Sequence, residues 1–270
     1  MTGTALILGG NGRFGRHMAE AFWNAGWRVR TFDRARDNLM EVASGADVIV
    51  NGWNPAYPDW SAQLPGLTDQ VIRAAEAHGA TILQPANIYV YGTGSPEVLR
   101  TETPHRAINS LGRLRIEMEA KLAASSAQVI LLRAGDYIDT EASGNWFDSV
   151  ITKSITKGRM VSPGDRDVPH AWAWLPDLAR AAVKLCERRE ALERGGEDIG
   201  KDQIIRRVLD HRAARRPAGL DRPGKRVLRG RDVRFCKQSE NRRKIRQTLF
   251  RAVEDLGALD HPKRDRIGFQ

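Results

Sequence analysis

The stretch Thr4–Gly15 (TALILGGNGRFG) decides the fold, because it joins a short apolar run to a glycine-rich turn. The apolar residues 4–8 predict a buried strand of a parallel sheet. The glycines that follow allow the backbone to turn sharply and to approach a ligand closely. Apolar residues then recur at helical spacing as far as Gly26, so we expect a helix that begins near Gly12 with its free N–H groups facing an anion.

A second predicted strand, residues 27–32, follows this helix and ends at Asp33. The acid lies about 20 residues after the glycine turn, where a carboxylate accepts hydrogen bonds from a ribose. An ordinary tight turn is the alternative explanation for three glycines. The order of strand, turn, helix, strand and acid nevertheless indicates a dinucleotide-binding site.

The next part of the chain alternates apolar strands with amphipathic helices. We expect strands at residues 47–51, 81–84 and 128–133 and helices at residues 67–78, 111–124, 145–157 and 176–189. This alternation predicts an α/β fold, a Rossmann-like doubly wound parallel sheet with a small, poorly defined C-terminal substrate region. Ligands of such sheets lie beyond the carboxyl ends of the strands, so we expect one crevice among residues 9–15, 33, 51–54 and 85–91.

Composition narrows the class of protein further. The chain has no run of about 18 apolar residues, which argues against a membrane span. The strand expected from Thr4 leaves no room for a signal peptide. The two cysteines, Cys186 and Cys236, are too far apart for a metal-binding set or a disulfide framework. We therefore expect a cytoplasmic protein without a metal site.

The net charge of +10 is carried entirely by residues 195–270, since residues 1–194 contain equal numbers of acidic and basic side chains. The sequence thus divides into a dinucleotide-binding domain, residues 1–194, and a basic tail, residues 195–270. Three interpretations of the tail stay open: a nucleic-acid arm, a folded substrate domain, or out-of-frame translation. The abrupt loss of Trp and Tyr favours out-of-frame translation, and we expect poor order in the tail. Nucleic acid is therefore an unfavoured partner.

Several further stretches resemble the extended short-chain dehydrogenase/reductase family, in its NAD-dependent epimerase/dehydratase branch. They include the Gly-Gly-x-Gly-x-x-Gly turn, a Val-Tyr-Gly, a Leu-Arg-Ala-Gly and the stretch before the last helix, at residues 9–15, 90–92, 132–135 and 170–182. The resemblance spans roughly residues 3 to 190. It implies an NAD(P)-dependent oxidoreductase or epimerase/dehydratase-like enzyme, acting on a small polar or nucleotide-linked substrate and forming a homodimer through two long helices.

The cofactor site follows from the turn, the acid and the resemblance together. We expect the cofactor to contact Gly9, Gly12, Arg13, Phe14, Gly15, Asp33, Arg34, Asn51 and Gly52. Asp33 favours NAD, because a carboxylate repels the 2′-phosphate of NADP. Arg34 and Arg36 could pair with that phosphate, which leaves NADP as the alternative.

The sequence departs from the family at its catalytic pair. Where the family has Tyr-x-x-x-Lys, this chain has Leu111 and Arg115, and Asn87 replaces the family's Ser or Thr. A leucine cannot transfer a proton, and an arginine does not substitute for the lysine. The remaining candidates for catalysis are Asn87, Tyr89 and Arg115. A protein that binds NAD(P) as a sensor or structural ligand, without catalysis, is the second hypothesis.

Overall fold

A five-stranded parallel sheet forms the centre of the protein. The computed structural model describes residues 3–96, 98–162, 171–194 and 226–228. The strands are β1 (Thr4–Leu8), β2 (Arg28–Thr31), β3 (Val48–Asn51), β4 (Thr81–Ala86) and β5 (Val129–Arg133). Their order is β2-β1-β3-β4-β5, and each neighbouring pair is parallel. The predicted doubly wound α/β fold is therefore confirmed, and its switch point lies between β1 and β3.

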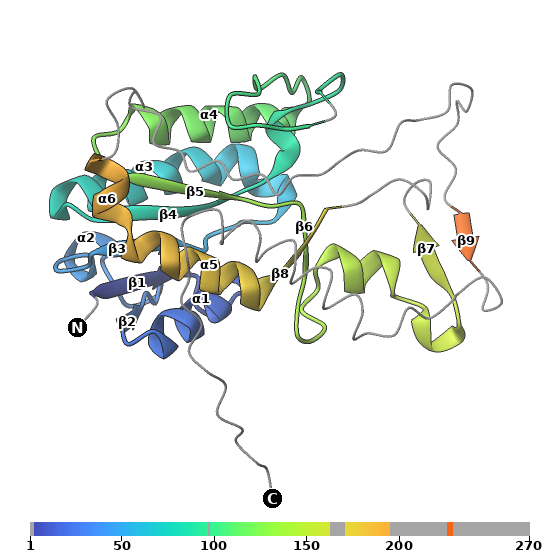
Figure 1. Cartoon of the computed structure of the whole chain (residues 1–270), viewed down its shortest axis with the longest axis horizontal. Coiled ribbons are helices and arrows are strands. Elements are labelled where there is room, and N and C mark those ends of the chain that lie inside the picture. The colour runs from blue at the N-terminus through green and yellow to red at the C-terminus, as the bar shows by residue number, and fades with distance from the viewer. Residues whose placement is uncertain (1–2, 97, 163–170, 195–225, 229–270) are drawn as a thin grey trace, which may run out of the picture.

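Helices cover both faces of this sheet (Figure 1). On one face lie α1 (Arg13–Asn24) and α5 (Leu175–Glu187), and on the other α2 (Leu39–Val42), α3 (Trp60–His78) and α4 (Ser110–Ala124). Strand residues alternate between two buried clusters, with Ala5 and Ile7 facing α1 and α5, and Leu6 and Leu8 facing the other helices. This alternation explains why β1 is apolar throughout. Helix α6 (Arg189–Arg194) follows α5.

Short elements gather beyond the carboxyl ends of the strands (Figure 1). They are the 3₁₀ turns η1 (Tyr57–Asp59), η2 (Ile88–Val90) and η4 (Ile155–Lys157), the π-helical turn η3 (Phe147–Ile151), and the strands β6 (Asp136–Ile138), β7 (Met160–Ser162), β8 (Trp172–Trp174) and β9 (Arg226–Leu228). Strand β6 pairs with β8 in parallel, and β7 pairs with β9 antiparallel. Of these elements, β6, β7, β8, η3 and η4 follow β5 and lie in the part of the chain where a small C-terminal region is expected.

Two expected helices differ from the structure. Helix α3 begins at Trp60 rather than at residue 67, because Trp60, Leu64, Thr68 and Val71 are buried on one face. The helix continues past Pro65, which lies in its second turn and has no N–H to donate. The helix predicted at residues 145–157 is instead split into η3 and η4, and Gly158, with φ of +64°, ends the second turn.

The expected tail, residues 195–270, lies outside the described residues apart from β9, and so does the boundary before it. The interpretations of the tail therefore stay predictions. Within the described ranges, no helix is both long and apolar enough to cross a membrane.

Three glycines form a close backbone crossing where β1, α1 and β3 meet. A Cβ atom on Gly15 would lie 2.2 Å from the carbonyl oxygen of Gly9, and one on Gly52 would lie 2.3 Å from that of Leu8. Gly9 itself has φ of +69°, and its Cβ would lie 2.8 Å from the carbonyl oxygen of Gly52. No side chain fits at these three positions. The start of α1 therefore packs directly against the ends of β1 and β3.

We expect Gly15→Ala to lower the free energy of unfolding by about 3 kcal/mol, because backbone atoms must move to admit the methyl group. Urea denaturation measures this change. The matched control is Gly66→Ala in α3, where a Cβ meets nothing within 4 Å. This substitution should stabilise the protein by about 1 kcal/mol. Equal effects of the two substitutions would contradict the crossing.

Candidate active site

The start of α1 offers a set of free backbone donors at the switch point of the sheet. Gly12 precedes the helix, makes no side-chain cap, and no acidic residue lies in the first turn. The amide of Gly12 donates to the carbonyl of Gly9 at 2.9 Å, which closes the turn beneath the helix. The first N–H groups of a helix lack intrahelical acceptors. With the helix dipole they suit a diphosphate.

Asp33 stands at the end of β2 with its carboxylate 54% exposed. One oxygen accepts from the amide of Ala35 at 3.0 Å, and the other lies 3.5 Å from Nε of Arg36. The guanidinium of Arg34 lies over the ring of Trp53, at 5.2 Å from its centroid. Asp33, Arg34 and Arg36 thus lie together at one exposed edge. The carboxylate suits a ribose hydroxyl, and the two arginines place positive charge beside it.

Two expected cofactor residues direct their side chains into the protein. Phe14 is buried in the core beneath α1. The amide nitrogen of Asn51 donates to Oε1 of Gln84 at 2.7 Å, and its oxygen accepts from the amide of Trp53 at 3.3 Å. Any contact of Asn51 with a ligand therefore falls to its backbone. Gly52 belongs to the glycine crossing.

Asn87 is held in place at the carboxyl end of β4. Its side-chain oxygen accepts from the amide of Tyr89 at 3.0 Å, and its carbonyl accepts from Arg133. Arg133 is completely buried and forms a two-pronged ion pair with Glu119 of α4, at 3.0 and 2.6 Å. This pair joins β5 to α4 and fixes the backbone of Asn87. The side-chain nitrogen of Asn87 has no hydrogen bond within the described residues and remains able to donate to a ligand.

Tyr89 belongs to an aromatic cluster. Its hydroxyl is 2.8 Å from the hydroxyl of Tyr57, and its ring centroid is 6.3 Å from that of Trp60. Burial and the bond to Tyr57 raise the pKa of Tyr89 above its usual value. Tyr89 therefore keeps its proton, and either hydroxyl of the Tyr57–Tyr89 pair can be the donor. Tyr91, by contrast, is a buried packing residue against Arg133 and His105.

Arg115 is packed inside the protein instead of projecting freely from α4. Its guanidinium carbon lies 4.1 Å from the centroid of Trp60, and Nη2 donates to Oδ1 of Asn54 at 2.8 Å. Burial lowers the pKa of Arg115, although the charges around it oppose this effect. Leu111, one turn earlier, is half-buried. Arg115 is thus a stacked, hydrogen-bonded arginine, and Leu111 beside it carries no polar side-chain group.

Tyr137 of β6 approaches this site from the other side. Its phenol is close enough to Arg115 and Arg13 to interact with both charges, and burial raises its pKa to about 12. Asp136 interacts with the phenols of Tyr89 and Tyr137. Arg115 therefore lies in electrostatic range of both Tyr89 and Tyr137, and Asn87 adjoins Tyr89 through its side-chain hydrogen bond. Within the described residues, no group of three or more His, Cys, Asp or Glu side chains is arranged to hold a metal ion.

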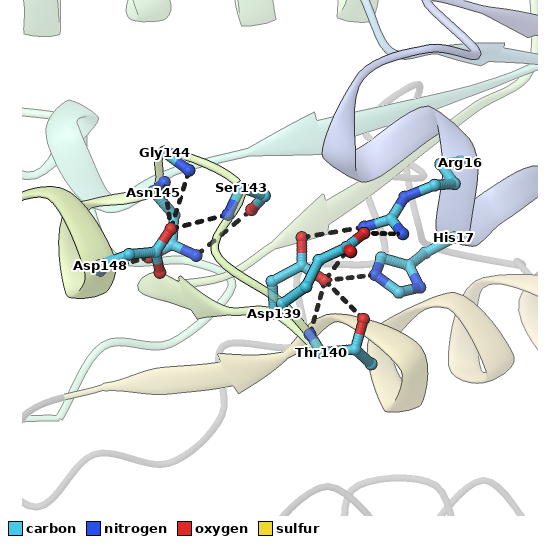
Figure 2. Close-up of polar contacts among 9 residues, drawn as sticks. Arg16, His17, Asp139, Thr140, Ser143, Gly144, Asn145 and Asp148 are labelled. Carbon is cyan, nitrogen blue, oxygen red and sulfur yellow. Dashed lines mark hydrogen bonds and ion pairs between the residues drawn. The ribbon is translucent and has the colours of Figure 1, made fainter.

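A segment that we call the strap, residues 139–148, is fastened to α1 (Figure 2). Nε2 of His17 is 2.6 Å from Oδ1 of Asp139, and both side chains are buried. Arg16 lies 3.4 Å from the same carboxylate and also pairs with Glu141. Burial raises the pKa of Asp139, but hydrogen bonds from Ser143, His17 and Thr140 outweigh it and lower that pKa to about 2.

Sequence reasoning missed His17, Asp139 and Tyr57. The first two are 122 residues apart in the chain, and neither lies in a recognisable motif. Tyr57 reaches Tyr89 only because the loop after β3 folds back over the end of β4. No local pattern could have shown these contacts.

Comparison with solved structures identifies proteins of similar architecture. UDP-glucose 4-epimerase from Brucella ovis, in complex with NAD, is 18% identical, with 72% of this chain and 75% of that chain covered and a TM-score of 0.57. dTDP-4-dehydrorhamnose reductase from Bacillus anthracis, in complex with NADP, is 15% identical, with 70% and 72% covered and a TM-score of 0.55. This chain shares their fold. The resemblance seen in the sequence is thus confirmed at the level of the fold.

A third structure of the same kind is UDP-glucuronic acid 4-epimerase from Bacillus cereus in complex with NAD, at 14% identity and a TM-score of 0.53. It matches 68% of this chain and 74% of its own. Neither a protein-family model nor a curated protein matches the chain.

We expect the Asp139 carboxylate to make stability depend on acid pH. Its folded-state pKa of about 2 lies below the unfolded value. Its contribution is therefore complete above about pH 4 and is lost as the pH falls towards 2. Between pH 5 and pH 2 the wild type should lose about 2 kcal/mol more unfolding free energy than Asp139→Asn. Urea titrations at several pH values measure it, with the exposed Glu141→Gln as control. Parallel curves for wild type and Asp139→Asn would disprove the assignment.

Proposed function

We propose that this protein binds a nicotinamide dinucleotide and acts as an NAD(P)-dependent oxidoreductase or epimerase/dehydratase on a small polar or nucleotide-linked substrate. The observation that carries this proposal is the uncapped start of α1, set by the glycine crossing at the switch point of the sheet. The solved structures that share the fold support it, since they are epimerases and reductases in complex with NAD or NADP.

The residues around the crevice fit such a cofactor. The first turn of α1 and Arg13 would hold the diphosphate, and Asp33 would accept from the adenosine ribose. When bound, the nicotinamide supplies a hydride donor or acceptor. Asn87 and Tyr89 then serve as hydrogen-bond donors to a substrate oxygen, because each has a polar group at the end of β4.

We favour NAD over NADP. The carboxylate of Asp33 lies where a 2′-phosphate would be repelled. Arg36 offsets part of this charge at 3.5 Å, and Arg34 lies nearby on Trp53, so NADP remains the alternative.

The second candidate is a dinucleotide-binding protein without catalysis. The observation that favours it is the position of Arg115, which is stacked on Trp60 and bonded to Asn54 beside Leu111. Neither residue supplies the proton of the usual mechanism. Incubation with NADH deuterated at C4 and a panel of nucleotide-linked ketosugars distinguishes the two candidates, because transfer of deuterium to any of them requires an enzyme.

We expect NADH to bind to the full-length protein and to quench its tryptophan emission in a saturable way. Asp33→Ala should raise the Kd for NADH about tenfold, because a charged hydrogen-bond acceptor is lost. The matched control is Asp69→Ala, which removes an exposed carboxylate that pairs with Lys121 at 2.7 Å between α3 and α4. This variant should bind NADH like the wild type.

The same titration with NADPH decides between the cofactors. Tighter binding of NADPH, strengthened further in Asp33→Ala, would assign the site to NADP. Failure of the wild type to bind either dinucleotide would refute the proposed function.

A further inference from the structure

The strap lies beside the beginning of α1 at two places, and a residue just before it packs nearby. Tyr137, just before the strap, packs against the core cluster that contains Phe14. Asp139 bonds to His17 at 2.6 Å. Further along, a Cβ built on Gly144 would lie 3.7 Å from Nη2 of Arg13. The strap therefore runs beside α1 from its second turn back to its first residue.

Arg13 is the charged group at the far end of this path. It is the first residue of α1 and is half-buried. Within the described residues it has no ion pair, and its charge interacts with the phenol of Tyr137. A guanidinium binds phosphate oxygens through two parallel hydrogen bonds, so an arginine placed here is suited to a diphosphate.

Hydrogen bonds within the strap fix the conformation of residues 143–148. One carboxylate oxygen of Asp148 accepts from the amides of Ser143, Gly144 and Asn145, at 2.8, 2.8 and 3.1 Å. Asn145 accepts in turn from the amide of Asp148 at 3.1 Å. Figure 2 shows the hydrogen bonds within this loop and the contacts of Asp139 at two separate places along the strap. These three amides already donate to Asp148 and do not bind an anion. Arg13 and the first N–H groups of α1 are then the groups that can bind one.

We propose that His17 and Asp139 are positioning residues for the dinucleotide site: they hold the strap against α1, and the strap confines Arg13 over the first turn, where it binds the diphosphate. This inference rests on the proposed function. An arginine has a large rotamer entropy, and confining it before the ligand arrives reduces the cost of binding. The contact between His17 and Asp139 acts only through Arg13 and touches no ligand itself.

The test is a double-mutant cycle on the full-length protein, with NADH as the probe and tryptophan quenching as the readout. Arg13→Ala should raise the Kd about tenfold, and Asp139→Ala about fivefold. In the Arg13→Ala background, Asp139→Ala should have no further effect on the Kd. The matched control is Asp69→Ala, which removes an exposed carboxylate that pairs with Lys121 between α3 and α4 and should leave the Kd unchanged.

The possible results separate the inference from the proposed function. Additive effects of the two substitutions, or an unchanged Kd in Asp139→Ala, would overturn the inference while leaving dinucleotide binding intact. Absence of NADH and NADPH binding to the wild type would overturn both. If Asp139→Ala does not fold, Asp139→Asn takes its place in the cycle, because the amide still bonds to His17 but loses the charge that holds Arg16. A weaker increase in the Kd, again abolished by Arg13→Ala, is then expected, and an unchanged Kd refutes the inference.

Discussion

The glycine crossing is the constraint on which the other parts of the site depend. Gly9, Gly15 and Gly52 bring three backbone segments so close that no Cβ fits between them. Because α1 starts there, its free donors lie at the switch point of the sheet, and the ends of β1 and β3 open towards the same side. A bulkier residue at any of the three positions would move the helix away from the strands and with it Arg13 and the strap.

A second buried contact organises the carboxyl end of β4. The ion pair of Arg133 and Glu119 is shielded from water, where an unpaired charge is costly to keep. Through the carbonyl of Asn87 it fixes the loop that also carries Tyr89. The two parts of the candidate site are therefore set by different physics: exclusion of side chains at the start of α1, and a paired buried charge at the end of β4.

The sequence was sufficient to predict the sheet, the four long helices on it and the glycine turn, but not the short α2, because long periodic segments and turns depend on residues close in the chain. It did not predict that Asn51 turns inward to Gln84 or that Arg115 stacks on Trp60, since both depend on which side chains meet across strands and helices. It also predicts too late a start for α3, because no local pattern shows that Trp60 is buried. The fastening of Asp139 to His17 joins distant residues and had no signal in the sequence.

Strand β2 has a consequence for behaviour in crowded solution. It is an edge strand of the described sheet, so the backbone N–H and C=O groups on its outer side have no partner strand there. Such a row invites pairing with a strand of another molecule. Here the strand has only four residues, two of which are Arg28 and Arg30, and Arg30 donates to the carbonyl of Ser44 at 2.9 Å. A short, positively charged edge strand repels the same strand of a second molecule, which disfavours edge-to-edge aggregation.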